Sequence, residues 1–410
     1  LCAGWWVSPT IDGFGDFSLT VCLLGLAFVS FTQGLQIGIF ALGLGLLHRH
    51  FSQLAFFGAA WWTLLEWLFP KFLPWYLGEP LVHVPYMAQT ADLAGVHGLG
   101  FLLVLQQGWL LQALRRRLRT NKPWRPVLRR GLGVLVLMLL YGVVRVHTLA
   151  EKDIPEIHMA IAQSGLDLGG SDSLAATRKG WQAYEALSFS PELKEAELVV
   201  WGETVLRVFL QHQVEWLQKM RQLADRTNKA FMLGSLDLTA AQDAEFNSAY
   251  LLEASGSPQI YHKQVLFPFG EYVPGVEYFE FLRDWPTTGR FVPGKDQDLF
   301  KFKGARIAPS ICFEAMLPGG QNVAVRKGAN VLINISDDTW MGDTPAGHQH
   351  LHSARLRAIE TRRDLVRSSN SGVSAFIDAS GRLFERMPLG TQGVASMAVK
   401  LREGQTIYVR

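Results

Sequence analysis

The stretch Pro309–Pro318, with the sequence PSICFEAMLP, joins the end of an apolar run to the start of a short helix-like run. The residues just before the junction, Arg306–Ile311, have the apolar character of a buried strand. Cys312 follows that strand directly, and ligands of α/β domains gather just outside the carboxyl ends of strands. Cys312 is therefore either a small buried residue or an accessible nucleophile.

The residues around this stretch alternate between strand-like and helix-like segments from Glu156 onward. Predicted strands cover Ile157–Gln163, Glu197–Trp201, Ala230–Leu238, Asn247–Ala254, Gln259–Val265, Arg306–Ile311, Ala329–Ser336 and, as one or two strands, Leu365–Asp378. Predicted helices cover Ser173–Leu187, Val214–Arg226 and Ala346–Arg363. Apolar strands mixed with helices predict an α/β domain, which we place at residues 151–410.

The first 150 residues have a different composition, since charged residues make up only 18% of the whole chain and most of them lie later. Leu19–Leu47 is uncharged throughout, which exceeds the roughly 20 residues needed to cross a bilayer. Further apolar segments cover Leu54–Phe69, Leu93–Leu114 and Leu132–Ala150. Four such segments favour a transmembrane helical domain at residues 1–150 over the buried core helices of a soluble protein.

Basic residues indicate how this domain is oriented. The loop predicted between the third and fourth segments contains Arg115, Arg116, Arg117, Arg119, Lys122, Arg125, Arg129 and Arg130. His48-Arg49-His50 separates the first two segments. Positively charged loops stay cytoplasmic, so four crossings place residues 1–16 and everything after Ala150 on the opposite side. Topology explains this basic loop, and a net charge of +3 gives no reason to expect a nucleic-acid partner.

Three reactive side chains stand at or near predicted strand ends: Glu203 after ELVVW, Lys263 within IYHKQVLFPFGEYVP, and Cys312. A carboxylate can take the proton of a thiol that attacks a carbonyl carbon, and an ammonium group can stabilise the resulting oxyanion. On spacing alone, each residue also has a structural explanation, as a buried cysteine, a capping glutamate or a lysine at a strand edge. Three scattered cysteines give neither a disulfide framework nor a metal-binding spacing.

The motifs WGET, HKQVLFPFGEYVP and ICFE, in this order, resemble the Glu-Lys-Cys signature of the carbon–nitrogen hydrolase (nitrilase) superfamily. The membrane half narrows the resemblance to the apolipoprotein N-acyltransferases. Further matches are FNSAYL, ISDDTWMG, GVHGLGFLLVL and the long block that spans residues 348–378. The resemblance implies an α-β-β-α sandwich after the membrane domain.

The resemblance also implies roles for individual residues. Cys312 would be the acylated nucleophile, Glu203 the general base and Lys263 the oxyanion stabiliser. The residues expected to line or support the site are Glu271, Glu314, Phe313 through its backbone N–H, Asn247 and Trp340. Structural ion pairing is the alternative for the two additional glutamates. Apolar side chains expected to line a surface opening are Phe267, Phe269, Tyr272, Val273 and Trp340.

The implied reaction passes an acyl chain from a phospholipid to the cysteine, and then to the N-terminal amine of a diacylglyceryl-modified apolipoprotein, without metal or cofactor. It places the enzyme in the bacterial inner membrane with a periplasmic catalytic domain. A membrane-tethered amidase or nitrilase and an inactive lipoprotein-binding scaffold are the alternatives.

Two motifs depart from the family pattern. Trp201-Gly202-Glu203 replaces Trp-Pro-Glu, which predicts a looser backbone before the base, and Asp337-Asp338 replaces Asn-Asp. The family also has additional spans before Leu1 and after the globular domain, so we expect this chain to be a fragment.

Overall fold

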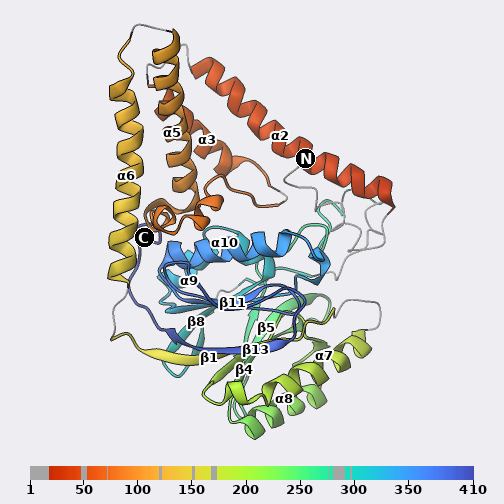
Figure 1. The fold of residues 1–410 in the computed structure, drawn as a ribbon. Helices are drawn as coiled ribbons and strands as arrows, with labels where there is room; N and C mark the ends of the chain where they lie inside the picture. The colour runs from red at the N-terminus through yellow and green to blue at the C-terminus, as the bar shows by residue number, and fades with distance from the viewer. Residues whose placement is uncertain are drawn as a thin grey trace.

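The computed structural model describes residues 18–47, 53–71, 73–119, 122–149, 153–167, 173–276, 278, 280, 291–295 and 298–410. A group of helices is followed along the chain by two β-sheets (Figure 1). The helical group consists of α2 (Leu19–Leu47), α3 (Leu54–Leu68), η1 (Glu79–His83), α4 (Pro85–Ala88), α5 (Ala91–Arg119) and α6 (Arg125–Thr148). The predicted loop His48-Arg49-His50, residues 1–16 and the predicted domain boundary after residue 150 lie outside the described residues.

The first sheet has the strand order β13-β1-β2-β4-β5-β6, with β3 paired to β4. Its strands are β1 (Glu156–Gln163), β2 (Leu198–Val200), β3 (Leu206–Phe209), β4 (Ala230–Leu238), β5 (Glu245–Leu252), β6 (Gln259–His262) and β13 (Gly393–Lys400). The second sheet has the order β12-β11-β10-β9-β8-β7. Its strands are β7 (Phe300–Phe302), β8 (Ala305–Ile311), β9 (Val331–Ser336), β10 (Leu365–Ser369), β11 (Ser374–Ile377) and β12 (Leu383–Met387). The prediction did not include β3, β7, β12 or β13.

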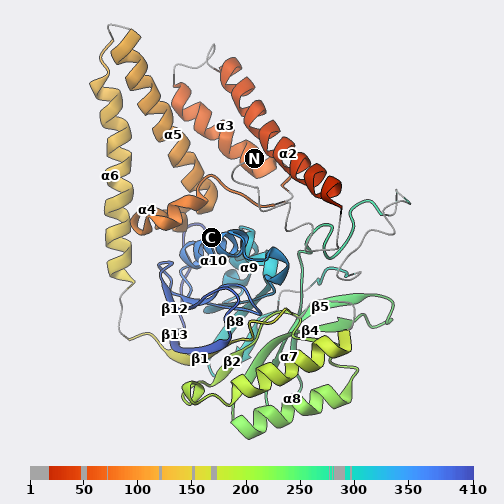
Figure 2. The same ribbon diagram turned by 45° about the vertical axis from the view of Figure 1, so that its right-hand side comes forward.

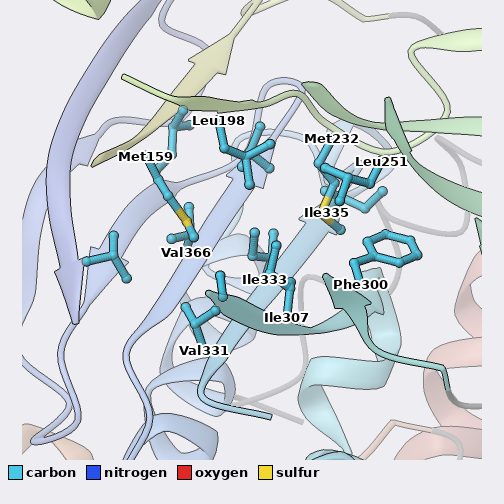
Figure 3. Packing of buried hydrophobic residues seen from close by; sticks show 14 of the residues in the cluster. Met159, Leu198, Met232, Leu251, Phe300, Ile307, Val331, Ile333, Ile335 and Val366 are labelled. Carbon is cyan, nitrogen blue, oxygen red and sulfur yellow. The ribbon is translucent and has the colours of Figure 1, made fainter. Parts of the chain in front are cut away.

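The two sheets pack face to face through alternate residues of their strands. In β1, Met159 and Ile161 face the second sheet, while Ala160 faces the other way. In β9, Ile333 and Ile335 belong to the same inter-sheet core (Figure 3). Since each side chain of this kind contributes about 1.5–3 kcal/mol when fully buried, this layer is a main source of the stability of the domain.

Helices cover the outer faces of both sheets, so the predicted α-β-β-α sandwich is confirmed. On the first sheet lie α7 (Ser173–Ser188) and α8 (Val214–Thr227), through a core that includes Tyr184 and Met220. On the second sheet lie α9 (Gly320–Arg326) and α10 (Ala346–Thr361), through a core that includes Ala324 and Ala354 (Figure 2). Because both faces of each sheet are covered, the central strands read as continuous apolar runs.

Three of the four predicted spans are long and apolar enough to cross a membrane, namely α2, α5 and α6, and α3 is a shorter apolar helix. The basic loop was predicted at residues 115–130, but the connection between helices α5 and α6 is shorter. Helix α5 continues to Arg119 and α6 begins at Arg125, because arginine favours helix and Pro126 suits the first turn. Helix α5 is kinked at Gly95, which has a φ of +65° that glycine adopts at low cost.

Asp92, in the first turn of α5, joins the helical group to the sandwich. Its Oδ1 accepts a hydrogen bond from Tyr141 Oη at 2.7 Å. Its Oδ2 accepts from Arg145 Nε of α6 at 2.9 Å, and from Arg362 Nε and Nη2, directly after α10, at 3.0 and 2.9 Å. An apolar cluster that includes Val96 and Ile359 surrounds the junction. The sandwich is therefore docked on the helices through a buried, fully hydrogen-bonded carboxylate.

We expect Arg362→Leu to destabilise the folded protein by up to about 3–5 kcal/mol, because it removes a partner from a buried carboxylate. The measurement is the thermal unfolding midpoint in detergent. Arg226→Leu is the matched control, because Arg226 forms an exposed ion pair with Glu185 at 3.2 Å, and such pairs contribute about 0–1 kcal/mol. Equal shifts for the two variants would contradict the role given to Asp92.

Candidate active site

Three strand ends from two sheets bring the predicted reactive residues together. Glu203 follows β2 and Lys263 follows β6 in the first sheet, while Cys312 follows β8 in the second. Lys263 Nζ lies 3.4 Å from Glu203 Oε1 and 2.8 Å from Glu271 Oε2. All four residues are buried. Burial lowers the pKa of Lys263, but Glu271 and Glu203 outweigh this effect and raise it overall, so the lysine stays an ammonium ion.

Cys312 has an unusual backbone conformation, with a φ of +48° in the left-handed region. A non-glycine residue adopts this conformation only where its surroundings hold it. Burial raises the pKa of the thiol, the nearby Glu203 carboxylate raises it further, and Lys263 acts in the opposite direction. The resting cysteine is therefore a protonated thiol that needs a base in order to react.

Asn247 of β5 holds the two carboxylates side by side. Its Nδ2 donates hydrogen bonds to Glu203 Oε1 and Glu271 Oε1, both at 2.8 Å. Glu271 Oε2 also accepts from the backbone N–H of Phe267 at 2.8 Å. Asn247 and Glu271 thus fix the positions of Glu203 and Lys263. Both residues lie where they can support the reactive residues, as expected.

Glu314 has a different surrounding from that of the other glutamates. Its Oε1 accepts from Tyr261 Oη at 2.9 Å and from the backbone N–H groups of Gln264 and Val265 at 2.7 and 3.1 Å. Its Oε2 accepts from Ile311 N at 2.7 Å. The Glu314 carboxylate therefore ties the strand end before Cys312 to the segment after Lys263, and its oxygens are occupied.

Aromatic rings cover the reactive residues on one side. Phe267 contacts both Phe313 and Trp340, with ring centroids 5.2 Å apart in each pair. Trp340 packs against the buried pair Met341 and Ala346, and Leu26 and Val29 of helix α2 pack against the same pair. These contacts form a continuous apolar connection from the residue after Cys312 to an apolar helix.

The helix-like run predicted after Cys312 is a five-residue 3-10 turn, η4 (Cys312–Met316). Phe313 is its second residue, so its backbone N–H has no partner within the turn. A turn of this length has too small a dipole to favour a thiolate by itself. The donor predicted for the oxyanion is therefore one backbone N–H group rather than a helix end.

The backbone at Gly202 and Glu203 is held firmly, although a glycine in place of proline predicted a looser backbone there. Glu203 N donates to Ser336 O at 3.2 Å, and Glu203 O accepts from Asn370 Nδ2 at 2.7 Å. A Cβ on Gly202 would lie 2.1 Å from Asn370 Oδ1. The glycine makes room for this clamp, so the prediction of a loosened backbone was wrong.

The second departure from the family motif places an acid next to the expected base. The Asp337 backbone N–H donates to Glu203 Oε2 at 2.8 Å. Burial raises the pKa of the Asp337 carboxyl to about 7, against hydrogen bonds from Thr339, and the Glu203 carboxylate raises it as well. This carboxyl group titrates near neutral pH.

A second polar group beside Cys312 was missed by the sequence reasoning, and it consists of Asp338, His350 and Arg367. Asp338 accepts from Arg367 Nη2 at 2.7 Å and lies 3.0 Å from His350 Nδ1. Potential ligand atoms of Cys312, Asp338 and His350 lie within 4.8 Å of one another. Both carboxylate oxygens of Asp338 and both ring nitrogens of His350 already have hydrogen-bond partners within the protein. The group therefore fits a hydrogen-bond network better than a metal site.

Comparison with known proteins agrees with both halves of the fold. The sequence profile for carbon-nitrogen hydrolases matches residues 160–408, and that for the apolipoprotein N-acyltransferase N-terminal domain matches residues 1–109. An apolipoprotein N-acyltransferase of Bradyrhizobium diazoefficiens is 30% identical over 377 residues, which cover 86% of this chain and 69% of that protein. One from Pseudomonas aeruginosa is 30% identical over 431 residues, covering 99% and 80%.

Among solved structures, a carbon–nitrogen hydrolase superfamily protein of Xanthomonas campestris is 18% identical, covers 60% of this chain and 91% of its own, and superposes with a TM-score of 0.44. The profile matches and the relatives identify the family. The chain belongs to the apolipoprotein N-acyltransferase family, and it is an acyltransferase of bacterial lipoprotein biosynthesis.

Proposed function

We propose that this acyltransferase moves an acyl chain from a phospholipid to Cys312, and from there to the N-terminal amine of a diacylglyceryl-modified apolipoprotein. The observation that supports it most directly is the buried group of Glu203, Lys263 and Cys312, built from three strand ends. It combines a base, a fixed positive charge and a thiol in one water-poor place.

In the first step, the thiol sulfur attacks the ester carbonyl carbon while its proton passes to Glu203. Lys263 Nζ and the Phe313 N–H stabilise the oxyanion. The ester C–O bond then breaks, and the lysophospholipid leaves with the proton from Glu203. In the second step, the amine attacks the thioester, Glu203 takes a proton from the nitrogen, and the C–S bond breaks to return the thiol.

The apolar connection to α2 supports a lipid donor. Of the residues predicted to line an opening, Tyr272 is exposed, while Phe267, Phe269, Val273 and Trp340 are half-buried. Phe267 and Trp340 both touch the apolar connection described above. A water-soluble amide would gain nothing from such a route, so the arrangement favours acyl transfer over the amidase alternative.

The arrangement of the helices supports a periplasmic catalytic domain in the inner membrane. The end of α5 and the beginning of α6 lie remote from the sandwich in both views (Figures 1 and 2). Arg116, Arg117, Arg119 and Arg125 lie at these two helix ends. Because basic segments remain in the cytoplasm, we place the sandwich on the other side.

We expect Cys312→Ala and Cys312→Ser to abolish acylation of a diacylglyceryl lipopeptide while the protein stays folded. The reason is that no thioester can form without the sulfur. Mass spectrometry of the lipopeptide measures the transfer, and the unfolding midpoint in detergent checks the fold. Transfer near the wild-type rate by Cys312→Ala would rule out Cys312 as the nucleophile. If the wild-type protein bound the lipopeptide without acylating it, the scaffold alternative would be favoured.

We expect Glu203→Gln to block acyl-enzyme formation, because the thiol keeps its proton. Lys263→Met should slow it by about a hundred- to a thousandfold, since one oxyanion donor is worth about 3–4 kcal/mol. The rate is read from the intact mass of the protein after mixing with phospholipid. Lys219→Met serves as the control, because Lys219 forms an exposed pair with Glu215 on α8. Normal acylation of Glu203→Gln would move the base to another carboxylate, of which Glu271 is the nearest to Lys263.

Orientation is tested with single cysteines added to a chain that lacks Cys2, Cys22 and Cys312. In spheroplasts, Ser257→Cys, in the exposed turn after β5, should react at once with a membrane-impermeant thiol reagent. Lys122→Cys, in the basic connection, should react only after the membrane is opened. The reverse pattern would place the sandwich in the cytoplasm and would contradict the assigned acceptor.

A further inference from the structure

Both ring nitrogens of His350 face hydrogen-bond acceptors. His350 lies in α10 and is 0% exposed. Its Nε2 is 2.9 Å from the backbone carbonyl oxygen of Cys312, and its Nδ1 is 3.0 Å from Asp338 Oδ1. A carbonyl oxygen only accepts hydrogen bonds, so Nε2 carries a proton. The charge of His350 then depends on whether Asp338 is ionised.

Asp338 is an ionised carboxylate. Arg367 Nη2 lies 2.7 Å from its Oδ2, and the Ser336 hydroxyl donates to its Oδ1 at 2.8 Å. Burial raises the pKa of Asp338, but Arg367 and His350 outweigh it and hold this pKa well below its usual range. Since an ionised carboxylate also only accepts, Nδ1 of His350 carries a proton too. His350 is then an imidazolium, and the group of Asp338, His350 and Arg367 has one net positive charge.

The carbonyl that His350 holds belongs to the peptide that carries the oxyanion donor. The C=O of Cys312 and the N–H of Phe313 lie in one planar trans unit and point in opposite directions. Fixing the carbonyl oxygen therefore fixes the direction of the N–H. Cys312 has a φ of +48°, so this peptide needs support from its surroundings. Asn334 Nδ2 adds only a longer contact to the same oxygen, at 3.5 Å.

We propose that His350, kept as an imidazolium by Asp338, is a positioning residue that orients the Phe313 N–H toward the oxyanion and places positive charge beside the thiol. The Cys312, Asp338 and His350 ligand atoms lie within 4.8 Å of one another, so the imidazolium stands beside the sulfur and opposes the Asp338 carboxylate, which raises the pKa of the thiol. Glu203 and Lys263 face the thiol from the first sheet. Asp338 and His350 lie beside it from the second, and Arg367 is bound to Asp338. The proposal rests on the proposed role of Cys312 as nucleophile.

The test compares His350→Ala and His350→Gln in the full chain in detergent. We expect His350→Ala to slow acylation of Cys312 by phospholipid about 10- to 100-fold at an unchanged KM, which is part of the value of a whole oxyanion donor. Glutamine can donate to the Cys312 carbonyl, so His350→Gln should recover part of the rate. His352→Gln is the matched control, because His352 lies on the same helix but contacts His83 at a ring distance of 4.2 Å.

A second readout separates positioning from plain structural support. The rate of Cys312 alkylation by iodoacetamide is measured against pH. Alanine and glutamine are neutral, so both His350 variants lose the positive charge beside the thiol. Their alkylation rate against pH should therefore move to higher pH by about one unit or more, while His352→Gln keeps the wild-type profile. If His350→Ala does not fold, the profile of His350→Gln decides.

Three outcomes have distinct meanings. Unchanged acylation and an unchanged profile in the variants would overturn the proposal. Slow acylation with a wild-type profile in both would also overturn it, because it would show a structural role without the charge. Phospholipid acylation that persists in Cys312→Ala would instead overturn the proposed function, and the alkylation profile, which needs no acyl transfer, would still decide on His350.

Discussion

The buried Lys263 ammonium is the charge on which the rest of the site depends. Removing an ammonium ion from water costs several kcal/mol, so its position requires close carboxylates. Glu271 at 2.8 Å and Glu203 at 3.4 Å supply them, and Asn247 keeps the two carboxylates side by side. The arrangement holds the proposed base, Glu203, and the proposed oxyanion partner, Lys263, in fixed positions before any substrate arrives. Burial raises the pKa of the Cys312 thiol, and Glu203 raises it further against the effect of Lys263, so the thiol is protonated at rest.

The site is built from residues of both sheets, and the sandwich that contains it is docked on the apolar helices. Cys312 comes from the second sheet and its partners from the first, so the inter-sheet core sets the distance between them. Helix α10 connects the candidate active site with the junction between the sandwich and the helical group. It provides His350 beside Cys312, and directly after its end Arg362 binds Asp92 of α5. The proposed reaction requires such a fixed relation, because the proposed phospholipid donor has to reach the Cys312 thiol from the lipid.

The fold class and the gathering of Glu203, Lys263 and Cys312 could be predicted from the sequence, because apolar runs end just before or near each of them. The resemblance added Asn247 and Glu271, which the structure places in contact with Glu203 or Lys263. His350 and Asn370 were missed, since their side chains bind backbone carbonyl groups, which a sequence pattern does not show. The strand β12 was missed because its alternation is weak, and Gly202 was misjudged because the clamp of Asn370 comes from a distant strand end.

One pulse-chase measurement on the wild-type protein tests directly whether Cys312 carries the acyl group between donor and acceptor. The chain is incubated with a phospholipid of one defined acyl chain, and its peptides are mapped by mass spectrometry before and after a diacylglyceryl lipopeptide is added. We expect the peptide that contains Cys312 to gain one acyl group and then to lose it as the lipopeptide gains the same mass. An acyl group on another residue, or a lipopeptide that gains mass while the Cys312 peptide never does, would contradict it.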